Sequence, residues 1–338
     1  MRIILDAFGG DLAPLEPLKG ARAAVKEYGV EILAVGDVEK MTTVCRENNI
    51  DTKGIAFKQA DGVFDMHRDA MDIVKKAKDT SLYVAFKALA DGEGDAMVSA
   101  GSTGAVIMGA TFIIKRLKGC KRPALGMLMP GKNPDGFLLM DCGANADVRP
   151  EMLSRFATIG KVYMEKVTGR QNPRIALLNN GTEDSKGDEV HIRAYKLLAR
   201  DKNLNFIGNI EGRDILNDEA DVVVADGFSG NIALKTIEGA AAFMNGKMKE
   251  MFKSGLGGMI SAMLMKKQLK AFKKRMDYTE YGGAPVLGVQ KGVITAHGSS
   301  DANAFKNAIR QAVKYAENDV GETIEKALAE SESGEENA

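Results

Sequence analysis

The chain has 338 residues, 45% of them hydrophobic, which is enough to bury a sizeable core in one or two lobes. Its 46 Lys and Arg residues balance its 46 Asp and Glu residues, so the formal net charge is zero. This balance argues against nucleic-acid binding through bulk charge, because such binding needs a strongly positive surface.

The cysteines and the apolar runs place the chain among soluble proteins. Cys45, Cys120 and Cys142 are isolated, and their spacing indicates neither a disulfide framework nor a metal site. The first apolar run is too short for a signal peptide, and no run reaches the ~18 residues of a membrane span. We therefore expect a cytoplasmic protein with reduced thiols.

Short, nearly continuous apolar runs predict strands along the whole chain. The nine predicted strands begin at Arg2, Glu31, Ala96, Ala124, Phe137, Arg174, Asn205, Asp221 and Gly292. Helical patterns lie between most of them. This alternation predicts an α/β protein with three layers, in which helices cover both faces of a mainly parallel sheet. We expect one catalytic domain over residues 1–330 and a disordered acidic tail over residues 331–338.

Glycine-rich polar loops follow several predicted strands. They span residues 6–11, 99–105, 141–147, 179–189 and 226–231. Carboxyl ends of parallel strands share one edge of a sheet, so we expect these loops to gather around a common anion site. Turns alone also need Gly and Asn at such junctions, and that structural explanation stays open.

Two charged or titratable residues stand in these polar surroundings. Lys186 lies in the loop 179–189, where it is either solvated or acts electrostatically on a bound anion. His297 follows a predicted strand, and its loop either caps the next helix or contacts substrate. His67 and His191 are expected to be surface or helix residues. No dinucleotide fingerprint or complete phosphate-binding P-loop is present.

Residues 240–277 interrupt the alternation and predict a helical hairpin. The first arm carries a face of Phe and Met residues, and glycines follow it. The second arm begins with the apolar residues Met259, Ile260, Met263 and Leu264 and continues into the basic residues Lys266, Lys267 and Lys270.

Nine motifs, in order, resemble the bacterial phosphate acyltransferase family. They are DAFGGD, SAGSTGA, KRPALG, LLMDCGANAD, NPRIALLNNGTEDSKG, NFIGNIEGRDI, ADVVVADGFSGNIALKTIEG, YGGAPVLGV and HGSSDANAFKNAI, and they run from Asp6 to about Ile309. Members make acyl-phosphate from acyl carrier protein thioesters and inorganic phosphate for phospholipid synthesis. The resemblance implies a phosphotransacetylase-like and isocitrate-dehydrogenase-like fold and a homodimer. It also implies peripheral membrane association and a downstream glycerol-3-phosphate acyltransferase, without metal, nucleotide or other cofactor.

The resemblance also assigns residues. Lys186 and Asn231 match catalytic positions of the family. The matching substrate-binding residues are Asp6, Gly9, Gly10, Ser102, Thr103, Gly282, Gly283, Ala284, His297 and Ser299. Two departures lie in the first loop: Leu12 stands where the family often has His, and Phe8 where Met is common. No role for that His carries over to this chain.

Several alternatives stay open. The hairpin could pack in a dimer or core, insert into an anionic membrane, or dock acidic acyl carrier protein. The membrane or carrier contacts would be Leu256, Met259, Ile260, Met263, Lys266, Lys267 and Lys270. The activity could instead be that of a short-chain phosphotransacetylase using acyl-coenzyme A, and the protein could also be a membrane scaffold without catalysis.

Overall fold

The computed structural model describes residues 1–133, 136–276, 280 and 282–335, with only the backbone at Leu256 and at residues 273–276 and 332–335. Within these residues, eleven strands form one sheet in the order β3-β2-β1-β4-β11-β10-β5-β6-β9-β7-β8. The strands are β1 Arg2–Asp6, β2 Glu31–Gly36, β3 Ile55–Gln59, β4 Ala96–Ser99, β5 Ala124–Met129, β6 Phe137–Met140, β7 Arg174–Asn179, β8 Asn205–Glu211, β9 Val222–Val224, β10 Ala284–Leu287 and β11 Gly292–Thr295.

The sheet consists of two parallel halves that run in opposite directions. Strands β3, β2, β1, β4 and β11 are parallel to one another, as are β6, β9, β7 and β8. Between them, β10 is antiparallel to both β11 and β5, and β5 is antiparallel to β6. The predicted mainly parallel sheet is confirmed. The prediction that all the polar loops share one edge is wrong, because the second half is reversed.

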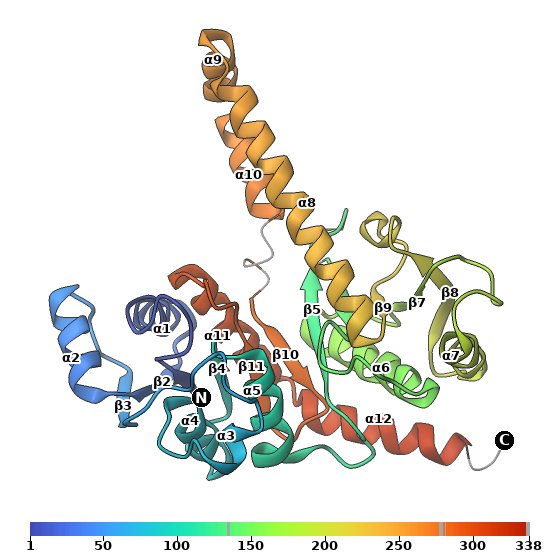
Figure 1. The fold of residues 1–338 in the computed structure, drawn as a ribbon, viewed down its shortest axis with the longest axis horizontal. Helices are drawn as coiled ribbons and strands as arrows, with labels where there is room; N and C mark the ends of the chain where they lie inside the picture. Colours follow the sequence, from blue (N-terminus) through green and yellow to red (C-terminus); the bar gives the residue numbers. More distant parts are fainter. Residues whose placement is uncertain (134–135, 277–279, 281, 336–338) are drawn as a thin grey trace.

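Helices cover both faces of each half (Figure 1). The helices are α1 Leu15–Tyr28, α2 Val38–Glu47, α3 Asp72–Lys75, α4 Ser81–Ala90, α5 Thr103–Gly109, α6 Pro150–Tyr163, α7 Glu189–Arg200, α8 Gly227–Lys253, α9 Leu256–Leu264, α10 Lys266–Met276, α11 Ala302–Glu317 and α12 Val320–Glu335. Two π-helical segments, η1 Ala110–Lys115 and η2 Met164–Thr168, extend α5 and α6, and η3 Ile215–Asn217 is a 3₁₀ turn.

In the part of the chain that the structure describes, three apolar clusters form the core. One lies under α4, α5 and the start of α8, a second under α6, α7 and α12, and a third between the first half-sheet and the packed pair α1 and α11. Strands buried on both faces explain why their sequences are apolar runs and not alternating patterns. Burial of this surface is the main stabilising contribution to such a fold.

All nine predicted strands are present, and two further strands were not predicted. Strand β3 is the sheet edge and is only partly buried, so its sequence IAFKQ mixes polar with apolar residues. Strand β10, APVL, has four residues and contains Pro285, which usually argues against a strand. The expected disordered tail is also corrected: α12 continues through residues 331–335, and residues 336–338 lie outside the described part.

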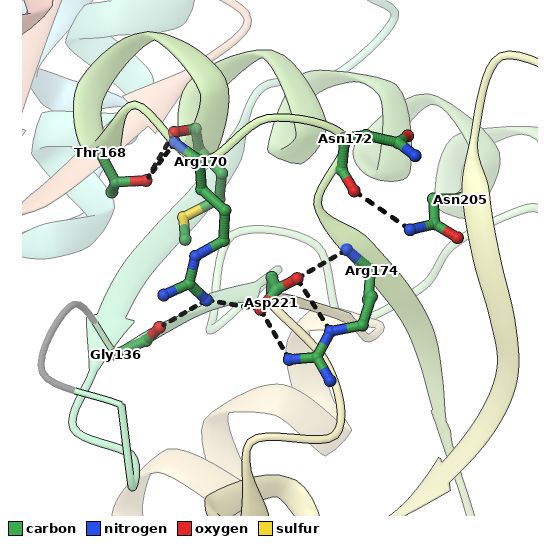
Figure 2. Close-up of polar contacts among 8 residues, drawn as sticks. Gly136, Thr168, Arg170, Asn172, Arg174, Asn205 and Asp221 are labelled. Carbon is green, nitrogen blue, oxygen red and sulfur yellow. Dashed lines mark hydrogen bonds and ion pairs between the residues drawn. The ribbon is translucent and has the colours of Figure 1, made fainter.

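An ion cluster around the buried carboxylate of Asp221 joins the amino ends of β7 and β9. Figure 2 shows Arg170 and Arg174 beside Asp221, which precedes β9. Arg174 donates from its guanidinium to both Asp221 oxygens at 2.9 and 3.1 Å, and its backbone N–H donates at 2.8 Å. Burial alone would raise the pKa of Asp221, but these donors lower it. The cluster fixes the register of two neighbouring strands.

The predicted hairpin is present, and its first arm is longer than expected. Helix α8 runs without a break from Gly227 to Lys253, and α9 and α10 follow it. These helices rise away from the rest of the molecule (Figure 1). At the far end, Met259, Ile260 and Met263 expose 52%, 59% and 77% of their surface. Leu256 begins α9, while its side chain and Asp277 lie outside the described part.

Among the described residues, no helix has the length and hydropathy to cross a membrane. The same part of the chain holds no group of three His, Cys, Asp or Glu residues placed to bind a metal ion.

Candidate active site

A cavity of about 300 Å³ lies between α5 and α8, against the central strands of the sheet. Its polar lining residues include Thr103, Asn231, His297 and Ser300, together with the ion pair of Lys235 and Glu238, whose Nζ and Oε2 are 2.7 Å apart. The apolar part of its wall is formed by Ile107, Leu125, Met127, Cys142 and Leu234. Such a hollow suits a ligand with a polar head and an apolar chain.

The strand pair β10 and β11 forms one side of the cavity. Gly282, Gly283 and Ala284, for which substrate binding is predicted, line it. A Cβ atom on Gly283 would lie 2.5 Å from the Thr295 carbonyl oxygen, so glycine is needed where the two strands come together.

His297 lines the cavity just beyond β11, and Ser299 fixes its tautomer. The Ser299 backbone N–H donates to His297 Nδ1 at 3.3 Å, and the Ser299 hydroxyl lies 2.8 Å from the same nitrogen. When Nδ1 accepts a hydrogen bond, the ring proton of neutral imidazole is on Nε2. His297 therefore offers an Nε2–H donor, while Ser299 supports it from outside the set of cavity-lining residues.

Asn231 reaches the cavity because the start of α8 packs closely on another loop. Asp226 caps α8, accepting from the Phe228 and Ser229 backbone N–H groups at 2.9 Å. A Cβ on Gly230 would lie 1.9 Å from the Asp141 carbonyl oxygen. Asn231 follows on the exposed side, close to Gly143.

The loop 141–147 is organised by its own buried carboxylate. Asp141 Oδ1 accepts from the Leu125, Gly143 and Ala144 N–H groups, and Oδ2 accepts twice from Asn145, all within 3.1 Å. Burial raises the pKa of Asp141, and these donors oppose the rise. The small polar residues of loops 141–147 and 226–231 thus hold each other in place, which is the structural explanation that the sequence left open.

The loop 6–11 likewise has a structural role, and it does not line the cavity. Asp6 is buried and accepts from the Ser99 hydroxyl at 2.7 Å, and its burial raises its pKa. A Cβ on Gly9 would lie 2.7 Å from the Gly101 nitrogen, and one on Gly10 would lie 2.9 Å from the Gly298 carbonyl oxygen. The predicted substrate-binding residues Asp6, Gly9 and Gly10 therefore hold the β4 and β11 loops together.

The structure distinguishes between the neighbouring residues Ser102 and Thr103. Thr103 is the first residue of α5 and lines the cavity. Ser102 precedes the helix, makes no side-chain capping bond, and is not among the lining residues.

Lys186 lies apart from the cavity. Its side chain is 47% exposed and its Nζ is 4.0 Å from Glu183 Oε2. Its loop borders a second hollow of about 630 Å³ on another side of α8, lined by residues that include Asn179, Asp188, His191 and Ser229. Lys186 itself lines neither hollow. Strand β7 lies farther from the centre of the sheet than β6 and β9, and the residues Gly143 and Asn231 that follow those two strands line the cavity.

His191 lies on helix α7, in agreement with the expected surface or helix position, and its ring joins the starts of α7 and α8. Its Nδ1 lies 2.8 Å from Asp188 Oδ1 and its Nε2 lies 3.6 Å from Asp226 Oδ2, with 14% of the side chain exposed. Asp226, and then Asp188, raise the pKa of His191. Burial would raise the pKa of Asp226, but His191 and the Ser229 N–H lower it to about 2. Asp188 three residues before His191 was the available sequence signal, since an N-cap side chain reaches that position.

The cavity also contains a thiol, Cys142, which donates to the Leu125 carbonyl at 3.1 Å. Burial raises its pKa well above the usual value, so it is protonated at neutral pH and is a poor nucleophile.

Comparison with known proteins identifies the family. A family profile described as "Fatty acid synthesis protein" matches residues 1–323. The phosphate acyltransferase of Dictyoglomus turgidum is 41% identical, over 97% of this chain and 98% of its own. That of Geobacillus thermodenitrificans is 44% identical, over 97% and 99%.

Solved structures share the fold. A phosphotransacetylase from Streptococcus pyogenes has a TM-score of 0.63 at 19% identity and 94% coverage of both chains. A branched-chain phosphotransacylase from Enterococcus faecalis V583 has a TM-score of 0.57 at 15% identity, covering 94% of this chain and 99% of its own. The predicted phosphotransacetylase-like fold and the family resemblance are both confirmed. The chain belongs to the phosphate acyltransferase family of acyltransferase enzymes.

Proposed function

We propose that this protein transfers a fatty acyl group from the thioester of acyl carrier protein to inorganic phosphate, giving acyl-phosphate for phospholipid synthesis. Family membership supports the reaction. The observation that carries it for this chain is the 300 Å³ cavity, whose lining combines polar donors, neutral and charged, with apolar side chains. An anion and the first part of an acyl chain need those two surroundings side by side.

The reaction needs no protein nucleophile. An oxygen of hydrogen phosphate attacks the thioester carbonyl carbon, a C–O bond forms and the C–S bond breaks. The pantetheine sulfur leaves as a thiol, and the proton that it takes up balances the one that hydrogen phosphate loses. The protonated state of Cys142 supports this direct route over one through an acylated cysteine. The protein then contributes orientation and stabilisation of the developing oxyanion.

Donors that line the cavity fit these tasks. The Nε2–H of His297 and the hydroxyl of Thr103 would hold phosphate, and the Asn231 amide would donate to phosphate or to the thioester carbonyl oxygen. The apolar side chains of Ile107 and Leu234 would contact the acyl chain.

Lys186 keeps its proposed electrostatic role, which is to reduce repulsion between phosphate and the oxyanion. Its ammonium group is half exposed and only loosely held by Glu183, so it can be redirected towards a ligand. Because it lines neither hollow, this role requires the ammonium group to approach the cavity when substrate binds.

Acyl-phosphate formation from palmitoyl-carrier protein and phosphate, compared with that from acetyl-coenzyme A, tests the activity. We expect the long acyl-carrier protein substrate to be used. Preference for acetyl-coenzyme A would favour the short-chain alternative that the shared fold suggests, and the lack of any product would contradict both.

Two substitutions test the residues. Asn231→Ala and Lys186→Ala should each lower kcat about 100-fold without lowering the unfolding temperature. Lys202→Ala, at another exposed lysine, is the control and should behave as wild type. A folded Lys186→Ala variant with the wild-type rate would exclude the electrostatic role.

The exposed tip of the hairpin supports contact with an anionic membrane surface, to which the apolar product could pass. Exposed apolar residues on α9 lie next to Lys266, Lys267 and Lys270 on α10. We also propose a homodimer, and use of the product, an activated acyl donor, by a glycerol-3-phosphate acyltransferase. The protein would be cytoplasmic and peripheral to the membrane.

Vesicle flotation separates the three interpretations of the hairpin. Replacing Met259, Ile260 and Met263 with Gln should abolish flotation with phosphatidylglycerol vesicles. Phe112→Gln, at an exposed apolar residue outside the hairpin, should not. Undiminished flotation of the triple variant would exclude insertion. A change in sedimentation or in carrier-protein affinity would then indicate a dimer or docking surface.

A further inference from the structure

Thr295 combines two properties that no other described residue of the cavity shares. It lines the cavity at the end of β11, and its side-chain hydroxyl is buried without any hydrogen-bond partner in the described part of the chain. Only 6% of the residue is exposed. The other buried side-chain atoms in this condition, on Tyr28, Asn209 and Tyr315, belong to residues that do not line the cavity.

Strand geometry places the Thr295 side chain on the cavity face of the sheet. Side chains two residues apart on a strand share a face. Val293, two residues earlier, packs in the same core cluster as the cavity residues Leu125 and Cys142. Thr295 therefore faces the same layer, at the point where β11 ends and the cavity begins.

The neighbours of Thr295 explain why its hydroxyl is unpaired. Its partner on β10 is Ala284, which has no polar side chain. Its partner on β4 is Ser99, whose hydroxyl already donates to Asp6 at 2.7 Å and accepts from the Gly101 N–H at 3.0 Å. A buried hydroxyl without a partner is unfavourable and uncommon in folded proteins. A ligand in the cavity would supply the missing acceptor.

We propose that the Thr295 hydroxyl donates a hydrogen bond to the phosphate substrate, which makes Thr295 a further phosphate-binding residue of this site. The proposal rests on the proposed function. Hydrogen phosphate presents mainly acceptor oxygens, and His297, two residues further along, offers a second donor at the same cavity. A rotation about χ1 between staggered positions turns the hydroxyl towards the ligand.

Thr295→Val is the decisive variant, because valine keeps the shape and removes only the hydroxyl. It should raise KM for phosphate about 10-fold or more, as expected for a hydrogen bond to a charged group. The unfolding temperature should stay the same or rise, since no protein hydrogen bond is lost. Thr295→Ser should restore KM to within about 3-fold of wild type, because serine retains the donor.

Thr158→Val is the matched control. Thr158 is also 6% exposed, but its hydroxyl bonds to the Ser154 carbonyl within α6, and it does not line the cavity. This variant should leave KM for phosphate unchanged. A wild-type KM in Thr295→Val, or an equal rise in Thr158→Val, would overturn the proposal.

Calorimetric titration with inorganic phosphate separates this inference from the proposed function. If the wild type forms no acyl-phosphate but binds phosphate, an affinity about 10-fold weaker in Thr295→Val still supports the inference. Equal affinities of the two proteins overturn it, and so does the absence of phosphate binding to the wild type.

Discussion

The inner and outer parts of α8 use glycine in opposite ways. In the first turn, Gly227 and Gly230 are buried against the loop 141–147, with no room for a Cβ at either position. Further out, a Cβ on Gly239 or Gly246 would have no heavy atom within 4 Å among the described residues. One helix therefore contains glycines that permit close packing and glycines that only weaken it. The difference lies in what surrounds the helix, and not in the helix itself.

The strongest test of this contrast is Gly230→Ala. The added Cβ would meet the Asp141 backbone oxygen at 1.9 Å, which neither side can relieve without moving α8 off its loop. We expect a loss of about 4 kcal/mol or more in unfolding free energy, or no folded protein. Gly239→Ala is the matched control, and urea denaturation compares the two. Equal stability of both variants would contradict the packing explanation.

A smaller effect is expected where α8 begins. Asp226→Ala removes two capping hydrogen bonds and the partner of His191. We expect a loss of about 2 kcal/mol in unfolding free energy at pH 6, measured by urea denaturation. The same substitution at Asp37, which caps the exposed helix α2 with one bond, should cost about half as much. A smaller loss at Asp226 than at Asp37 would refute a stabilising role for the contact between Asp226 and His191.

The junction that His191 forms with Asp188 and Asp226 should make the free energy of unfolding depend on pH. The raised pKa of His191 means that its contribution is complete below about pH 6.5 and is lost as pH rises through the folded value. The lowered pKa of Asp226 means that its contribution is present above its ordinary value and is lost as pH falls towards about 2. The junction is therefore strongest between about pH 4 and 6.5.

His191→Gln should remove this alkaline decline. Urea unfolding at pH 5.5 and pH 8.5 should give a difference about 1 kcal/mol smaller than in wild type. His297→Gln, at a ring that faces no carboxylate within ion-pair distance among the described residues, is the control. An unchanged pH dependence in His191→Gln would show that the ion pair contributes nothing.

The smallest effect is expected in the outer part of α8. Gly246→Ala places a methyl group in open space and removes the flexibility of glycine, so it should raise unfolding free energy by about 1 kcal/mol at most. A destabilised Gly246→Ala variant would mean that this part of α8 is covered in solution, as in a dimer.

The sequence predicted the fold well where burial alone decides the pattern. Strands such as VVV at β9 and FLLM at β6 are apolar on both faces, so a run of hydrophobic residues identifies them without knowledge of their neighbours. Strand β3 was missed because half of it faces solvent at the sheet edge, and β10 because its four residues include a proline.

Strand direction was less predictable than strand position. Between β5 and β6 the sequence PGKNPDG is too short for a helical crossover and rich in turn residues, which is the signal of a hairpin. Recognising this hairpin would have shown that β6 runs antiparallel to β5. Thr295 could not have been found from sequence, because its significance depends on what Ser99 and Ala284 leave unpaired.

Helix α8 has a mechanical consequence. Its 27 residues form a rod of about 40 Å, with Asn231 and Lys235 near one end and the apolar tip beyond the other. Because α8 has no break, turning the whole helix by about 5° about its start would move its far end by roughly 3 Å. The orientation of the helix that carries Asn231 at the cavity and the position of the exposed tip are therefore geometrically coupled.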